Sequence, residues 1–217
     1  MKYVMFDMDG VLLDSERGAF NRFRESLLEI GIREDLEELL KKYVGIPTRK
    51  IAEEILERHK SMVSVDQFLA LHHGRGSYYE MCSDLKPMEG LVDFLEFLKE
   101  KGIPMAVVSS TSSRNVLITL DRLNILKYFG AVVCGDAVKQ GKPSPEPYLK
   151  AAEYLQAAPD ECLVIEDSKS GVESAVRAGM YVIAYKKASP EQNTELASGK
   201  VFEYRELKEL LIKEKLL

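Results

Sequence analysis

The stretch from Lys2 to Asp14 reads KYVMFDMDGVLLD, and it decides the fold because an apolar run ends abruptly in acids. The run at residues 2–6 is short, continuous and apolar, which is the pattern of a buried parallel strand. Asp7 and Asp9 follow at once, and Gly10 allows a tight turn between strand and helix. Because ligands bind beyond the carboxyl ends of parallel strands, this turn is predicted to belong to a functional site.

Four further runs of the same kind follow along the chain, at residues 103–108, 131–134, 162–165 and 181–184. Helical patterns accompany them, at residues 90–101, 113–123, 145–156 and 170–178. Strands that alternate with helices form a parallel sheet with right-handed crossovers. The sequence therefore predicts an α/β fold, a Rossmann-like parallel sheet with helices on both faces.

The first strand is separated from the second by roughly 100 residues, which is too long for one crossover. This interval has helical patterns at about residues 15–30, 34–43, 47–59 and 64–81, and Gly45-Ile46-Pro47 breaks two of them. We therefore expect an inserted α-helical domain at residues 15–84, and a catalytic core formed by residues 1–14 and 85–217.

Composition limits the class of protein. Apolar residues make up 46% of the 217, which excludes a wholly disordered chain. The net charge of −5 argues against non-specific binding to nucleic acid or anionic membranes. No apolar run approaches the roughly 18 residues of a membrane span, and the early aspartates are unlike a signal peptide. The three cysteines are far apart without a Cys-x-x-Cys pair, so a cytoplasmic location is expected.

Polar residues follow the predicted strands or lie between them, and they should meet at one edge of the sheet. They are Asp7, Asp9, Ser109, Ser110, Thr111, Lys142, Glu166 and Asp167. Four carboxylates so close together would repel one another unless they hold protons or a cation. Hard oxygen ligands suit Mg²⁺, and the hydroxyls and lysine can donate hydrogen bonds to phosphate oxygens. The set indicates phosphoryl transfer through an aspartyl-phosphate.

The sequence resembles the haloacid dehalogenase superfamily, in the subgroup with a helical cap after the first strand. Within that subgroup it is most similar to β-phosphoglucomutases and sugar-phosphate phosphatases. All four superfamily motifs occur in order. They are Asp7-x-Asp9-Gly10-Val11, Ser109, Lys142 within Gly-Lys-Pro-x-Pro, and Glu166-Asp167 followed by Ser168-x-x-Gly171.

The resemblance implies a role for each motif residue. Asp7 would be the nucleophile that takes the phosphoryl group. Asp9 would protonate the leaving oxygen and then activate water. Ser109 and Lys142 would hold phosphate oxygens, with Lys142 also offsetting the charge on Asp7. Gly10, Ser110 and Thr111 are expected to contact the substrate.

The resemblance also implies a metal site for Mg²⁺, for which Mn²⁺ or Co²⁺ can substitute. Its ligands would be Asp7, the backbone carbonyl of Asp9, and Asp167. Glu166 would be either a further ligand or a support acting through water.

The inserted domain offers less specific candidates. Arg49 would bind a distal anionic group of the substrate, although a surface arginine is an equal alternative. Glu16 could line the pocket or a hinge. His72, His73 and Arg75 could also face the pocket, but a helix-surface position is favoured for these three.

The function expected from the resemblance is a phosphatase of small phosphorylated carbohydrates, working as a monomer with no nucleic-acid or membrane partner. The alternative is a β-phosphoglucomutase. Mutases carry a histidine five residues after the position of Asp14 and a lysine in the cap, where this chain has Ala19 and, by approximate alignment, Gly74. These departures favour the phosphatase. A phospho-accepting receiver domain is a remote alternative, because such domains are shorter and their phospho-accepting Asp follows a later strand. An inactive scaffold is also remote, because no motif residue is missing.

Overall fold

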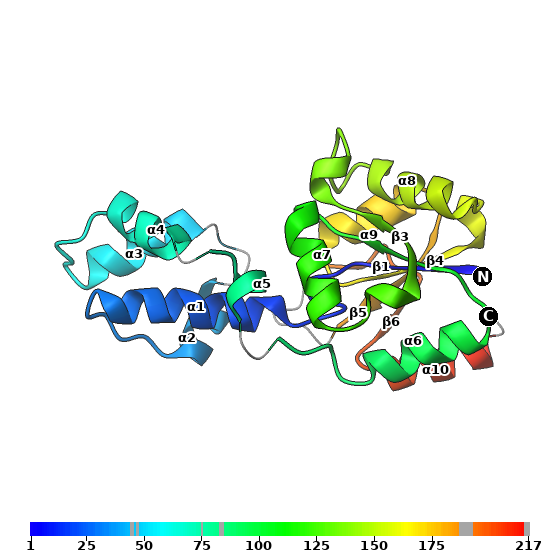
Figure 1. The fold of residues 1–217 in the computed structure, drawn as a ribbon, viewed down its shortest axis with the longest axis horizontal. Helices are drawn as coiled ribbons and strands as arrows, with labels where there is room; N and C mark the ends of the chain where they lie inside the picture. Colours follow the sequence, from blue (N-terminus) through cyan, green and yellow to red (C-terminus); the bar gives the residue numbers. More distant parts are fainter. Residues whose placement is uncertain (44–45, 47, 75, 83–84, 187–192, 215–217) are drawn as a thin grey trace. The chain divides into compact units, whose positions relative to one another are not determined.

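A computed structural model describes residues 1–43, 46, 48–74, 76–82, 85–186 and 193–214 of the chain (Figure 1). The chain divides into two compact units. One unit consists of Met1–Asp14 together with Leu85–Leu217, and the other of Ser15–Asp84. Each unit has buried hydrophobic residues of its own.

The first unit contains a six-stranded sheet in the order β3-β2-β1-β4-β5-β6, with every neighbouring pair parallel. Its strands are β1 (Tyr3–Phe6), β2 (Met105–Val108), β3 (Phe129–Val133), β4 (Cys162–Glu166), β5 (Tyr181–Tyr185) and β6 (Gly199–Val201). This confirms the predicted α/β fold. Strand β6 was not among the predicted strands; it is only 3 residues long and has a lysine at its centre.

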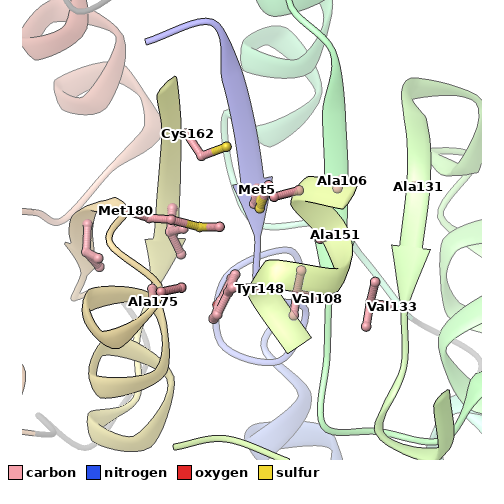
Figure 2. Close-up of a cluster of buried hydrophobic side chains, with 14 of the residues drawn as sticks. Met5, Ala106, Val108, Ala131, Val133, Tyr148, Ala151, Cys162, Ala175 and Met180 are labelled. Carbon is pink, nitrogen blue, oxygen red and sulfur yellow. The ribbon is translucent and has the colours of Figure 1, made fainter. Parts of the chain in front are cut away.

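Helices cover both faces of this sheet, as predicted. They are α6 (Leu91–Glu100), α7 (Ser113–Arg122), α8 (Glu146–Leu155), α9 (Lys169–Arg177) and α10 (Tyr204–Lys213), with short 3-10 turns at Leu126–Tyr128, Gly135–Ala137 and Pro159–Glu161. Helices α8 and α9 lie on one face, and α6 and α10 on the other (Figure 1). Figure 2 shows the cluster beneath α8 and α9, where Tyr148 and Ala175 meet Met5 and Val108 from the strands.

The second unit is helical, with α1 (Ser15–Glu29), α2 (Leu36–Tyr43), α3 (Thr48–Arg58), α4 (Val65–Gly74) and α5 (Tyr78–Met81). The single helix predicted at residues 64–81 was wrong. Gly76 takes a left-handed φ of +82°, which favours glycine, and Ser77 then caps α5 in a capping box with Glu80. A helix break was also predicted at Gly45-Ile46-Pro47. Two of these residues, Gly45 and Pro47, lie outside the described residues.

The chain leaves the first unit and returns to it at two segments that are hydrogen-bonded to each other. Leu13 forms an antiparallel bridge with Pro87. The N–H of Met88 donates to the carbonyl of Leu12 at 2.8 Å. The outgoing and returning segments of the core are thus paired at the point of insertion. Within the described residues, no helix combines the length and the apolarity that crossing a bilayer requires.

Candidate active site

Strand β1 and the turn after it position the first pair of acids. The N–H of Asp7 donates to the carbonyl of Ile165 at 3.0 Å, so Asp7 continues the pairing of β1 with β4. Gly10 then turns the chain with a left-handed φ of +79°, and its N–H donates to the carbonyl of Leu13. Asp7 is buried and Asp9 is half-buried at the carboxyl end of the central strands.

Lys142 lies at the centre of a buried charge cluster. Its ammonium donates to Asp7 Oδ1 at 2.5 Å, to Glu166 Oε1 at 2.7 Å and to the carbonyl of Val108 at 2.9 Å. An ammonium has three protons, and these contacts use all of them. A hydrogen bond from Lys142 to a phosphate oxygen would therefore require one of the three partners to be released.

The cluster stabilises the charged form of Lys142 and destabilises the charged form of Asp7. Burial alone would lower the pKa of Lys142, but the Asp7 and Glu166 carboxylates outweigh burial and hold it well above its usual value. For Asp7, burial raises the pKa to about 8, with Lys142 opposing the shift and Glu166 and Asp9 adding to it. Asp7 is thus a buried carboxyl whose negative charge needs more compensation than Lys142 supplies.

Glu166, at the end of β4, accepts four hydrogen bonds from the protein. Oε1 accepts from Lys142 and from the Tyr148 hydroxyl at 3.2 Å, and Oε2 accepts from the N–H and the hydroxyl of Ser168 at 2.8 and 2.9 Å. The side chain is fully buried. A Cβ added to Gly171 would lie 1.6 Å from Oε1, so only glycine leaves room for this carboxylate. These contacts favour the support role for Glu166 over direct ligation of a metal.

Asp167 is the next residue and is half-buried. Burial, followed by repulsion from Asp7 and Glu166, raises its pKa to about 9. Among the described residues, no three His, Cys, Asp or Glu side chains are grouped as a ready metal site. The carboxylates of Asp7 and Asp167 and the carbonyl of Asp9 are nevertheless all hard oxygen donors. A divalent cation would offset the negative charge that burial and, after it, mutual repulsion disfavour at both carboxyls.

The loop after β2 carries the predicted hydroxyl residues. Ser109 is buried, and its hydroxyl accepts the N–H of Thr111 at 3.1 Å. The Thr111 hydroxyl donates to Asp9 Oδ2 at 2.9 Å. Ser110 is exposed. The structure thus brings Ser109 and Thr111 into the same site as Asp9, and their roles toward a substrate stay predictions.

In the helical unit, the predicted substrate residue Arg49 is exposed and forms an ion pair with Asp66 at 2.8 Å. A pocket of this unit with a volume of about 220 Å³ is lined by Glu16, Ala19, Phe20, Phe23, Ile46, Thr48, Ile51 and His72. The surface position favoured for His72 was wrong, because this side chain is half-buried and lines the pocket. His73 is exposed, and Arg75 lies outside the described residues.

His72 should make stability depend on pH. Its ring stacks on Phe68, and its Nδ1 lies 3.0 Å from the Ser26 hydroxyl. Burial, with the charges of Arg22 and His73, lowers its pKa from 6.5 to about 4. Between these values the unfolded chain binds more protons than the folded unit, so stability falls as the pH is lowered from about 6.5 toward 4. His72→Gln should flatten this fall.

The measurement is the midpoint of thermal unfolding by circular dichroism at several pH values from about 7 to 4. His73→Gln is the matched control, because it removes an exposed histidine from the same helix. Its profile should stay close to wild type. An unchanged slope in His72→Gln would contradict the assignment.

Tyr148 also belongs to this site, although it was not among the predicted site residues. It lies in the first turn of α8, six residues after Lys142, and is fully buried. Its hydroxyl donates to Glu166, and the Lys142 ammonium lies 5.0 Å from its ring centroid, within cation–π range. The sequence feature that could have indicated Tyr148 is its position shortly after the Gly-Lys-Pro motif.

Tyr148→Phe should lower the free energy of unfolding by about 1.5 to 3 kcal/mol, because it removes one hydrogen bond from a buried carboxylate and keeps the ring. Tyr185→Phe is the matched control, since Tyr185 is equally buried and its hydroxyl has no partner within the described structure. That variant should stay within about 0.5 kcal/mol of wild type. Urea unfolding measures both, and equal effects would show that the Glu166 contact adds nothing.

Comparisons with known proteins cover most of the chain. Residues 4–185 match the profile of a family described as haloacid dehalogenase-like hydrolase. A phosphorylated carbohydrates phosphatase of Thermotoga maritima is 39% identical over 181 residues, 83% of this chain and 82% of that protein. A beta-phosphoglucomutase of Bacillus subtilis is 30% identical over 204 residues, 90% and 88% of the two chains. A solved HAD family hydrolase of Deinococcus radiodurans, with bound phosphate and sodium, superposes with a TM-score of 0.84 at 26% identity, covering 100% and 97%.

Proposed function

The chain belongs to the haloacid dehalogenase-like hydrolase family, and from this premise we propose that it hydrolyses phosphate monoesters of small phosphorylated carbohydrates. The observation that carries the proposal is the pair of acids after β1, each held by a different partner. Lys142 holds Asp7, and Thr111 holds Asp9. One acid is thus fixed beside a permanent positive charge, and the other beside a neutral hydroxyl.

This asymmetry suits two different tasks. Because Lys142 takes Oδ1 of Asp7, Oδ2 is the oxygen that attacks phosphorus. The bond from phosphorus to the sugar oxygen breaks, and Asp9 gives its proton to that oxygen. Asp9 then accepts a proton from the water that attacks the aspartyl-phosphate. Phosphate leaves, and Asp7 is regenerated.

Ser109 and a metal ion complete the proposed site. In the described contacts the Ser109 hydroxyl only accepts, so its own proton can be donated to a phosphate oxygen. Asp7, Asp167 and the carbonyl of Asp9 would hold Mg²⁺, with Mn²⁺ or Co²⁺ as substitutes. When bound, the ion supplies positive charge beside the transferring phosphoryl group. Glu166 keeps Lys142 in place rather than ligating the ion.

The phosphatase is favoured over the mutase that one relative is named for. The resemblance places a mutase histidine at the position of Ala19, and Ala19 lines the pocket of the helical unit with a side chain that cannot transfer a proton. The substrate would be a small phosphorylated metabolite of the cytoplasm, and the working form a monomer.

The test is phosphate release by the purified protein from a panel of phosphorylated sugars. Release should occur with Mg²⁺, stop with EDTA and return when Mg²⁺ is added back. A second assay supplies β-glucose 1-phosphate with catalytic glucose 1,6-bisphosphate. Rapid formation of glucose 6-phosphate with little free phosphate would show a mutase instead, and no release from any ester would refute the proposed function.

A further inference from the structure

Thr111 reaches across the sheet edge to the second acid of the first motif. Its hydroxyl donates to Asp9 Oδ2 at 2.9 Å, although the two residues are 102 positions apart in sequence. Thr111 follows β2 and Asp9 follows β1, which are adjacent strands. The contact therefore depends on the sheet and not on local sequence.

The backbone of Thr111 is held at both ends. Its N–H donates to the Ser109 hydroxyl at 3.1 Å, and its carbonyl accepts from the N–H of Gly135 at 2.9 Å. A Cβ added to Gly135 would lie 2.1 Å from the carbonyl oxygen of Ser110, so the β3 loop packs tightly against this segment. The hydroxyl is thus placed before any substrate arrives.

A fixed donor on one oxygen distinguishes the two oxygens of Asp9. Oδ2 accepts the hydrogen bond from the Thr111 hydroxyl, and because an unprotonated carboxyl oxygen is the stronger acceptor, we assign the proton that Asp9 transfers to Oδ1. The same hydrogen bond limits rotation of the carboxyl group about its terminal torsion, which is otherwise broad. Proton transfer in the transition state requires such alignment.

We propose that Thr111 is a positioning residue that orients the Asp9 carboxyl for proton transfer to the leaving oxygen. This rests on the proposed function. In the step concerned, Asp7 Oδ2 bonds to phosphorus, the phosphorus–oxygen bond to the sugar breaks, and the proton on Asp9 Oδ1 moves to the departing oxygen. Thr111 keeps its own proton throughout.

The role predicts a dependence on the leaving group. A sugar oxygen leaves poorly without a proton, whereas p-nitrophenolate leaves without help. Thr111→Val removes the hydroxyl and keeps the shape of the side chain. We expect it to lower kcat/KM about 10- to 100-fold for the best sugar phosphate of the panel, and less than about 3-fold for p-nitrophenyl phosphate. The ratio kcat/KM reports the first irreversible step, in which the leaving group departs.

Two further variants control this comparison. Thr111→Ser retains a hydroxyl, so its kcat/KM for both substrates should stay within about 3-fold of the wild-type values. Thr119→Val makes the same change at a fully buried threonine of α7 whose hydroxyl has no partner in the described part of the chain. It should change neither value, because removing an unpaired buried hydroxyl costs little. Thermal unfolding is recorded for every variant.

The outcomes of this comparison either support or overturn the positioning role of Thr111. A larger loss with the sugar phosphate, reversed by serine, supports the proposal. An equal loss with both esters assigns Thr111 to phosphate binding or to folding and overturns it, as does no loss with either. A wild-type protein that hydrolyses neither ester refutes the proposed function itself, and this proposal with it.

Discussion

Asp7→Asn should abolish phosphate release, with kcat lower by about 10⁴-fold or more, while the protein stays folded. An amide oxygen cannot form the acyl phosphate, so the reaction has no covalent route. The amide still offers an oxygen to the Lys142 ammonium, which keeps one of its three partners in place. Because burial already raises the pKa of the Asp7 carboxyl to about 8, the loss of its charge should alter stability little.

Two measurements complete this test. Rapid acid quench with ³²P-labelled substrate should trap label on wild type and none on Asp7→Asn or Asp7→Ala. Asp121→Asn makes the same change at an exposed position of α7 and should keep wild-type turnover. If either Asp7 variant retained more than about 1% of wild-type turnover, the nucleophile would have to lie elsewhere.

Lys142→Met should have the largest effect on stability, lowering the free energy of unfolding by about 3 to 5 kcal/mol. The lysine side chain is 3% exposed and lies between Asp7 and Glu166. Without it, Asp7 and Glu166 would lose the positive charge between them, so the buried pair would have to take up a proton or keep a negative charge with no compensation. Turnover should also fall by about 10³-fold, because Asp7 would lose the group that holds it.

Glu166→Gln should partly rescue the stability of Lys142→Met, because it removes one of the two facing charges. The double variant should be more stable than Lys142→Met alone by about 1 to 3 kcal/mol, yet remain inactive. Lys139→Met is the matched control, since Lys139 is exposed in the same loop. Strictly additive losses in urea unfolding would mean that Lys142 and Glu166 do not act as a pair.

The sheet was predictable because its central strands are buried on both faces and therefore read as continuous apolar runs. That signal is present in residues 2–6 and 162–165, and it is absent from β6, whose residues are Gly199, Lys200 and Val201. Register with β5, not composition, makes those three residues a strand. The break between α4 and α5 was not predicted either, because a single left-handed glycine, Gly76, interrupts an otherwise helical sequence.

For the site, the positions of the strand ends in the sequence predict which residues lie at the carboxyl edge of the sheet. They do not predict which atoms of those residues contact one another. The sequence placed Lys142 near Asp7, and only the structure shows that Glu166 and the Val108 carbonyl take its remaining protons. Tyr148 looks like an ordinary core aromatic in the sequence, since its polar contact depends on how α8 packs. The Thr111 contact with Asp9 likewise arises from the pairing of β1 with β2.

The pairing of Leu12 and Leu13 with Pro87 and Met88 has a consequence for how this protein can change. The main chain is already joined by hydrogen bonds where the inserted unit departs and returns. Because the core holds both ends of the insert together, the insert is equivalent to a closed loop. Doubling the length of such a loop costs only about 0.6 kcal/mol of chain entropy. Exchange of the insert for one of another length or another set of side chains should leave the sheet and its acids undisturbed. We therefore expect the insert to tolerate changes in length and side chains more readily than the strand-end residues of the core.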